Sequence, residues 1–324
     1  MKLYLTKHKG GQSRDITSLA VSWTWSGDKA SITRQLELEV AFVADSDLPV
    51  PEIGDLVTME DTERLFVGVI LKRSLGSEDH TMSATAFDYG IYLQKNDCTA
   101  KFTGATPEEI TRSLCAEKGI PVASLPTTGI QLRRKFAGVK INQAVTTVWS
   151  LAAEKNGKRY AIRYTPSGLL VKERTVSGES LVLKAAGNLM DATTTEDASN
   201  VVNSVAIYDK NGNFLQRLGD TESQGLIGVM EAHITQRDGA DAVSEANHQL
   251  EDGKQTRTVT ANVLGDLSLI TGETVVAREA RTGLEGIFWI DADVHTWKNN
   301  NYYAKLTLNC RNVAATASAG SEIE

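Results

Sequence analysis

The hydrophobic and polar positions of this chain repeat a three-strand pattern near its two ends. In residues 54–87 a turn glycine and an acid precede a strand, and two further apolar runs follow after polar loops. Residues 272–308 have the same order. The matching pieces are Gly54-Asp55 with Gly272-Glu273, 66–70 with 286–290, and 81–87 with 304–308. A duplicated β module in one chain indicates a part built for symmetric assembly rather than around a single pocket.

Alternation of apolar and polar residues predicts antiparallel strands through the first hundred residues. Val21, Trp23 and Trp25 alternate with small polar residues. Within residues 36–42, the apolar side chains alternate with Glu37 and Glu39. Strands of this kind bury one face and expose the other. We therefore predict a first β-barrel-like tube domain over residues 1–100.

Helical spacing replaces this alternation after residue 100. Thr106 and Glu109 form a capping box with proline at the first helical position, which predicts a short helix. Asn142 is placed to cap a second helix, which Gly157 ends. We therefore predict a small mixed α/β domain over residues 101–184.

The remaining chain is predicted to return to β structure. The Asn-Gly pair at residues 211–212 signals a hairpin, and a helix is expected at about residues 239–252, capped by Asp238. These elements are assigned to a second β-barrel-like tube domain over residues 185–313. Residues 314–324 are small and polar and are predicted to be disordered. The expected fold is mainly β with an α+β insertion, in which two similar barrel-like domains flank the mixed one.

Composition narrows the functional classes. The net charge is −7 and the basic residues are scattered, which argues against a dedicated nucleic-acid-binding surface. The N-terminus has no signal-peptide pattern, and no apolar run approaches the length of a membrane span. Three widely spaced cysteines, Cys98, Cys115 and Cys310, suit free thiols in a reducing cytosol, where they are expected to be small core residues.

Catalytic motifs are missing from the sequence. It contains no phosphate-binding loop, no Gly-x-Ser-x-Gly elbow, no His-Glu-x-x-His and no Cys-x-x-Cys. Carboxylate pairs at Glu37 and Glu39 and at Glu108 and Glu109 resemble glycosidase acids only in composition. A strand face and a helix first turn explain them. No catalytic residue and no cofactor are therefore predicted.

A single constellation has the residue types of a metal site. Asp291, Asp293 and His295 project from one face of a predicted strand, and carboxylates with an imidazole are able to hold a divalent ion. The alternative is that they form the polar outward face of an amphipathic strand, which alternation favours. No metal is therefore assigned, and these three residues stay as candidates.

Several of these segments, in their order and spacing, resemble tail proteins of the PBSX-like prophage XkdQ/YqbQ family. The segments that carry the resemblance are 66–70, 86–96, 102–104, 200–205, 264–266 and 290–295. Each is a strand or turn signature, and together they extend over nearly the whole chain. One departure is Leu226-Ile227-Gly228-Val229, where an aromatic residue and a glycine are expected.

The resemblance implies a baseplate hub protein of a contractile tail. In such hubs two similar β domains of each chain form, in a homotrimer, a ring of six that joins a sixfold tail tube to a threefold central spike. The implied partners are the chain itself, the spike protein, the tail tube protein and other baseplate proteins, without specific nucleic-acid or membrane binding. The implied location is the virion tail baseplate, assembled in the cytoplasm of the host bacterium.

Other readings remain open at this point. The chain is alternatively a cell-wall polysaccharide hydrolase or a carbohydrate-binding tail module. The resemblance also does not distinguish an infectious phage from a defective prophage or an R-type bacteriocin.

Overall fold

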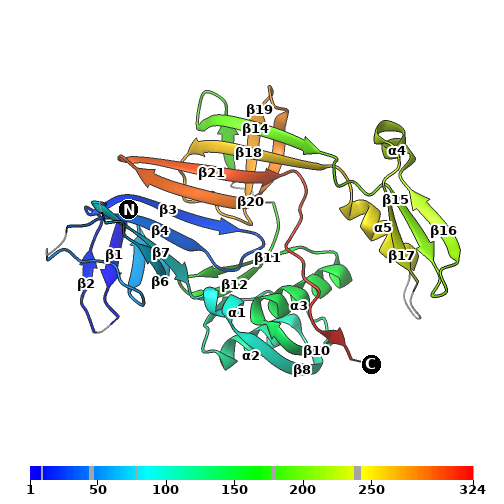
Figure 1. Cartoon of the computed structure of the whole chain (residues 1–324), viewed down its shortest axis with the longest axis horizontal. Coiled ribbons are helices and arrows are strands. Elements are labelled where there is room, and N and C mark those ends of the chain that lie inside the picture. Colours follow the sequence, from blue (N-terminus) through cyan, green and yellow to red (C-terminus); the bar gives the residue numbers. More distant parts are fainter. Residues whose placement is uncertain (9, 44–46, 78, 177–179, 237–241, 324) are drawn as a thin grey trace. The chain divides into compact units, whose positions relative to one another are not determined.

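The computed structural model describes all residues except 9, 44–46, 78, 177–179, 237–241 and 324. Strands hold 49% of the described residues and helices 16%, which confirms a mainly β fold (Figure 1). Within the described residues, no helix is long and apolar enough to cross a membrane.

The first β module is an antiparallel sheet in which one face of each strand is buried. Leu36 and Leu38 of β4 lie opposite Ala86 and Ala84 of β7, and all four are in the core. The alternation predicted from the sequence therefore places one stripe of each strand inside. The strands are β1 (Lys2–Thr6), β2 (Ser13–Asp15), β3 (Ala20–Asp28), β4 (Gln35–Ala41), β5 (Leu56–Glu60), β6 (Arg64–Ser74) and β7 (Thr81–Asp88).

The middle region is a mixed α/β structure with its own core. The Thr106 side chain accepts from the Glu109 backbone, and the Glu109 side chain accepts from the Thr106 backbone, which confirms the capping box. Trp149 is buried and its Nε1 donates to Thr111 Oγ1 at 3.0 Å. The elements are α1 (Ile91–Lys95), β8 (Asp97–Ala105), α2 (Pro107–Glu117), β9 (Val122–Ser124), β10 (Leu132–Lys140), α3 (Ile141–Asn156), β11 (Tyr160–Thr165) and β12 (Gly168–Glu173).

The start of α3 differs from the prediction. The helix begins at Ile141 with Lys140 as its N-cap, which makes no side-chain capping bond. Asn142 therefore lies inside the first turn, because β10 runs directly into the helix and leaves no loop for a capping residue. Gly157 ends the helix in a left-handed conformation with φ 71°, as predicted.

The second β module continues the sheet of the first. The first part of the long strand β20 pairs with β19, and its second part pairs with β3 of the first module. The sheet order from β14 to β2 is β14-β18-β21-β20-β3-β4-β7-β6-β5-β1-β2. The strands of this module are β13 (Leu181–Lys184), β14 (Leu189–Asp197), β18 (Thr256–Leu264), β19 (Thr274–Glu279), β20 (Leu284–Lys298) and β21 (Asn301–Asn309).

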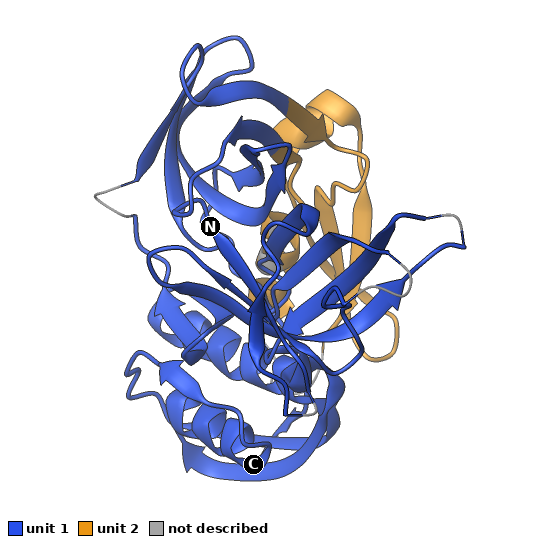
Figure 2. Ribbon diagram, turned by 90° about the vertical axis from the view of Figure 1, so that its left-hand side faces the viewer, with its two compact units in different colours: residues 1–193, 259–324 blue, residues 194–258 orange. Residues whose placement is uncertain are grey.

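Residues 194–258 form a compact unit of their own (Figure 2). Its sheet has the order β16-β15-β17, and the Asn-Gly hairpin joins β15 to β16. This differs from the prediction of one continuous domain over residues 185–313, because strand alternation alone does not show which strands share a sheet. Its elements are β15 (Ser204–Tyr208), β16 (Phe214–Gly219), α4 (Thr221–Ile227), β17 (Glu231–Thr235) and α5 (Ala242–Asp252). Asp238, the expected cap of α5, lies outside the described residues.

The C-terminal segment packs on the middle region, contrary to the expected disorder. Its short strand β22 (Ser321–Glu322) pairs with β10. Arg134 donates to the Ala319 carbonyl at 2.8 Å, and the Ala319 N–H donates to Thr147 Oγ1 at 2.9 Å. These bonds involve the backbone of the segment, so its small side chains gave no sign of them in the sequence.

Candidate assembly site

The two modules begin with the same turn. Gly54 and Gly272 have φ values of 93° and 94°, which favour glycine. In the first module Gly54 N donates to Ile70 O, and Ile70 N donates to Asp55 O. In the second, Gly272, Ile290 and Glu273 form the same two bonds. The repeat read from the sequence is therefore a repeat of backbone geometry.

The same irregularity follows in both copies. The pairing of β6 with β7 shifts between Ile70 and Lys72, and the pairing of β20 with β21 shifts between Ile290 and Ala292. Beyond this bulge the modules differ. β20 has β3 as a second neighbour, whereas in the described sheet β6 pairs there only with β7. We call the pairing of β20 with β3, residues 292–298 with 22–28, the seam.

Behind the seam lies a buried ion pair. Asp293 is 0% exposed and Arg34 is 5% exposed, and both guanidinium Nη atoms contact the carboxylate. Thr271 donates to Asp293 through its N–H at 2.7 Å and its hydroxyl at 2.6 Å. Burial alone would raise the pKa of Asp293, but Arg34 and the neighbouring His295 hold that pKa well below its ordinary value. The pair therefore stays charged inside the protein.

Glycine and aromatic residues make room for this pair. A Cβ on Gly27 would lie 2.2 Å from Arg34 Nη1, so any larger residue there would displace the buried guanidinium. The Arg34 guanidinium lies 4.0 Å above the Trp25 ring, a cation–π contact. His295 is 0% exposed, and its Nδ1 is 2.8 Å from the Tyr302 hydroxyl. Both modules supply residues to this cluster, so it joins them.

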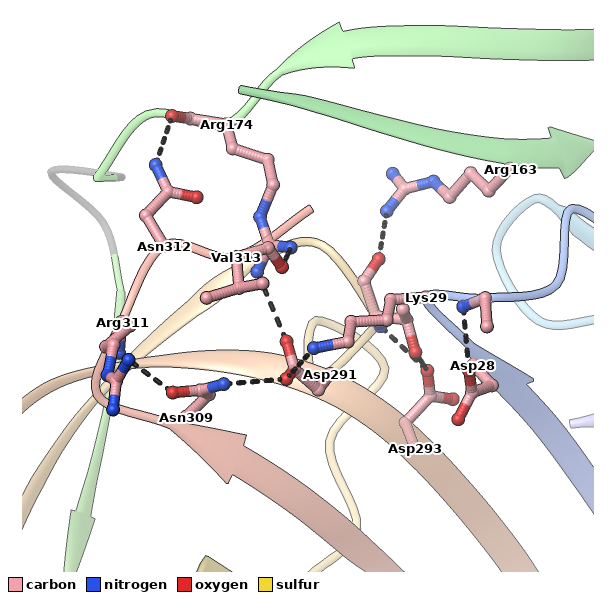
Figure 3. Close-up of polar contacts among 12 residues, drawn as sticks. Asp28, Lys29, Arg163, Arg174, Asp291, Asp293, Asn309, Arg311, Asn312 and Val313 are labelled. Carbon is pink, nitrogen blue, oxygen red and sulfur yellow. Dashed lines mark hydrogen bonds and ion pairs between the residues drawn. The ribbon is translucent and has the colours of Figure 1, made fainter. Parts of the chain in front are cut away.

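A second acid at the seam gathers cations from separate segments. Figure 3 shows Lys29, Arg174 and Asn309 converging on the Asp291 carboxylate. Lys29 follows β3, Arg174 follows β12, and Asn309 ends β21. Arg174 also donates to the Val313 carbonyl at 2.6 Å. Asp291 thus connects the first module, the middle region and the second module.

These contacts show where the three candidate metal ligands from the sequence lie. Asp291, Asp293 and His295 are buried, so the interpretation as a polar outward face is wrong. Arg34, Thr271 and the Leu269 carbonyl contact the strand face that the sequence pattern suggested was open. Arg34 and Lys29 already neutralise the two carboxylates. Among the described residues no group of three or more His, Cys, Asp or Glu side chains is arranged to hold a metal ion.

The acids of the two turns are also held by cations. Lys7 Nζ contacts Asp55 at 2.9 Å in the first module. In the second module Glu273 contacts Lys172 at 2.6 Å and Arg163 at 3.1 Å. Burial would raise the pKa of Glu273, but these two cations outweigh it and hold the pKa below its ordinary value. The second turn is thereby fastened to the middle region.

The opposite face of the seam is polar and crosses both modules in register. One cross-strand row runs through Thr296, Thr24, Glu37, Thr85 and Lys72, on strands β20, β3, β4, β7 and β6. The glutamate and the lysine of this row are exposed, and the threonines are partly buried. Flat rows of hydroxyls and charges on one sheet face suit a solvent-lined wall rather than a packed core.

The remaining candidate residues have structural positions. Glu39 accepts from the Ser22 hydroxyl at 3.0 Å, and Glu108 accepts from Thr128. The thiols of Cys98, Cys115 and Cys310 are free, as predicted. Cys310 is exposed, however, so its assignment to the core is wrong.

No pattern in the sequence indicated the partners of the seam acids. Arg34 sits between strands with no motif around it, and Thr271 is an ordinary turn residue. The one usable signal is the pair of carboxylates at alternate positions within an otherwise apolar strand, Asp291 and Asp293. Such carboxylates, when buried, require buried cations somewhere in the chain.

The chain is similar in sequence to proteins of one family. A family model described as YQBQ-like matches residues 23–309. The phage-like element PBSX protein XkdQ of Bacillus subtilis strain 168 is 20% identical over 259 residues, which cover 77% of this chain and 79% of that protein.

Two solved structures share the fold. The 43 kDa tail protein of prophage MuSo2 from Shewanella oneidensis has a TM-score of 0.74 at 13% identity, over 95% of this chain and 98% of that one. E. coli c3393 has a TM-score of 0.58 at 11% identity, over 100% of this chain and 80% of that one. It is described as a component of the type VI secretion system with structural similarity to the T4 bacteriophage tail proteins gp27 and gp5.

Proposed function

Because the chain belongs to the YQBQ-like family, we propose that it is the structural baseplate hub of a contractile phage tail or tail-like particle. Three copies form a pseudo-sixfold ring that joins the tail tube to the threefold central spike. The observation that carries this proposal is the duplicated module, with matched turns at Gly54 and Gly272 and one sheet running through both copies. Six equivalent modules from three chains match a sixfold partner on one side and a threefold partner on the other.

The two faces of the sheet support this role. The buried ion pair of Arg34 and Asp293 and the ring contacts of His295 with Trp25 and Tyr302 lock the two modules of one chain into a fixed arrangement. On the polar face, the row from Thr296 to Lys72 continues from one module to the next. We place this face on the lumen of the ring, where a hydroxyl-rich wall lets solvent or DNA pass without specific binding.

The proteins that share the fold support a tail assembly as the setting of this chain. The structures that share the fold come from tail proteins and from a secretion component likened to gp27 and gp5. We propose the spike protein, the tail tube protein and other baseplate proteins as partners, and the baseplate as the location. The middle region, α1 to β12, lies outside the ring in this proposal. The proposed role is structural rather than enzymatic.

Mass in solution tests the proposal. Light scattering on the purified chain, alone and mixed with the spike protein of the same particle, is expected to show a trimer in at least one condition. A chain that stays monomeric with the spike and instead cleaves or binds cell-wall glycan would overturn it in favour of a hydrolase or a carbohydrate-binding module.

A further inference from the structure

We propose that the exposed end of β6, residues 71–74, pairs as an antiparallel strand with the outer edge of β14 from a second copy of this chain. Within one chain, β20 and β3 form the seam. The proposed pairing is the equivalent contact between two chains. This inference rests on the proposed ring, and it names the two surfaces that join its chains.

The strand pairings of the two modules establish which strands are equivalent. Counting outward from the bulged strand, the first module has β6, β7, β4 and β3, and the second has β20, β21, β18 and β14. The matched pairs are Ile70–Ala86 with Ile290–Leu308, and Ala86–Leu36 with Leu308–Val259. β3 and β14 are therefore counterparts, as are β6 and β20.

The equivalence predicts where the next module joins. Within a chain, β3 of the first module pairs with β20 of the second. A rotation that carries each module onto the next requires β14 of the second module to pair with β6 of a first module, which belongs to another chain. Both edges are open in the described sheet. β14 ends the strand order, and beyond Ile70 the pairing of β6 is with β7 alone.

Side-chain contacts give the register of β14. Asn262 Nδ2 of β18 donates to Asp191 Oδ1 of β14 at 2.8 Å. Farther along, Arg257 Nε lies 3.8 Å from Glu196 Oε1. Both contacts fit one antiparallel register between residues 191–196 of β14 and 257–262 of β18, in which the paired residue numbers rise on one strand as they fall on the other.

This register gives the expected neighbours across chains. Thr194 of β14 is equivalent to Trp25 of β3, so the three residues after Thr194 are equivalent to Ser26, Gly27 and Asp28. In the seam, Ser26, Gly27 and Asp28 pair with Val294, Asp293 and Ala292 of β20. The equivalents of these three β20 residues in β6 are Ser74, Arg73 and Lys72. The expected inter-chain neighbours are Thr195 with Ser74, Glu196 with Arg73, and Asp197 with Lys72.

The charges at these edges are complementary. Lys72 and Arg73 are exposed at the end of β6, and Glu196 and Asp197 are exposed at the end of β14. Opposite charges that face each other across neighbouring strands attract, and like charges in the same positions are unfavourable. Since each chain carries a net charge of −7, copies repel one another unless such edges attract. A basic edge also discourages pairing with the wrong strand.

Charge reversal tests this pairing in the full chain with the spike protein. We expect Lys72→Glu with Arg73→Glu, or Glu196→Lys with Asp197→Lys, to weaken trimer formation roughly tenfold or more, because attraction becomes repulsion. All four changes together are expected to restore it. The matched control is Lys101→Glu with Lys135→Glu, exposed residues paired across β8 and β10, which leaves the trimer unchanged.

The outcomes separate the two proposals. Folded reversal variants that form trimers as well as the control does would overturn the strand pairing while leaving the ring intact. A native chain that forms no trimer in any condition would overturn the ring itself, and the pairing with it. Circular dichroism confirms that each variant is folded.

A cross-link gives a second and independent test. In a Cys310→Ser background, Ser74→Cys together with Thr195→Cys is expected to form disulfides between chains. Covalent dimers and trimers should then appear on non-reducing gels and vanish with reductant, and neither single cysteine variant should give trimers. A solution trimer of the double variant that yields no cross-link would contradict the proposed register.

Discussion

The two β modules share a turn and a bulge but differ in what lies beyond the bulge. In the second module β3 pairs with the bulged strand, and Asp291 and Asp293 are buried with their cations. In the first module the equivalent residues, Leu71 and Arg73, are exposed. The turn and the bulge match in the two copies, so the surroundings of each position decide which side chains it tolerates. The charge of Asp293 is buried because its strand has a paired neighbour and a buried cation in the same chain. The charge of Arg73 is exposed because the edge of its strand is open.

Removing the buried acid of the second module should change the stability of the protein more than any of the other substitutions. Asp293→Ala leaves the Arg34 guanidinium buried without a counter-charge and should cost about 3–5 kcal/mol of unfolding free energy. Arg73→Ala, at the equivalent exposed position, should change it by about 0.5 kcal/mol or less. Urea unfolding followed by circular dichroism measures both. Equal effects of the two substitutions would show that the seam is not a buried electrostatic contact.

The next prediction concerns pH and one acid of the first module. Asp88 is 4% exposed, and burial raises its pKa to about 7, although the Arg34 and Gly90 N–H groups donate to it. Its protonated form is therefore favoured in the folded state. The stability that Asp88 contributes is complete below its unfolded pKa of about 4 and is lost as the pH rises to about 7.

Unfolding measured across that range should show the loss. We expect a decrease on the order of 2–4 kcal/mol between pH 4 and pH 7. Asp88→Asn should remove most of this slope. Asp293 behaves oppositely, because its lowered pKa confines its loss of stability to pH values below about 4. A slope that persists unchanged in Asp88→Asn would assign it to another group.

A smaller effect compares the two turn glycines. Gly54→Ala and Gly272→Ala both place a Cβ on a left-handed backbone, which costs about 1–2 kcal/mol. A Cβ on Gly272 would also lie 2.9 Å from the Ala161 Cβ, whereas on Gly54 its nearest neighbour is His8 at 3.6 Å. The second variant should therefore lose about 1 kcal/mol more. Thermal unfolding of the pair decides this, and the reverse order would refute the packing argument.

The smallest effect concerns the cations on the turn acids. Lys7→Ala and Lys172→Ala remove partly exposed partners of Asp55 and Glu273, and each should cost about 1 kcal/mol or less. Glu273 keeps Arg163 when Lys172 is removed, so that variant should lose the less. Urea unfolding in low and high salt measures both. A loss that salt does not reduce would point to packing rather than charge.

The sequence predicted the local elements better than their partners. The capping box at Thr106, the end of α3 at Gly157 and the Asn-Gly hairpin follow from neighbouring residues. The duplicated turn was also readable, because glycine and an acid recur before matching apolar runs. Local patterns of this kind depend on a few adjacent positions, which the sequence shows directly.

Long-range pairing was not readable in the same way. The burial of Asp293 against Arg34 depends on two residues more than 250 positions apart, and alternation alone predicted an exposed face for Asp293. The independence of residues 194–258 likewise depends on which strands share a sheet. The anchoring of the C-terminal segment uses its backbone, which carries no sequence signal.

Electron microscopy of the chain assembled with the spike protein would show directly whether the proposed hub forms. We expect a closed ring of three chains in which six similar β densities surround the lumen, with the middle regions outside. Particles without a ring, or a ring whose lumen shows threefold but no approximate sixfold order, would contradict the claim that the duplicated module builds a pseudo-sixfold hub.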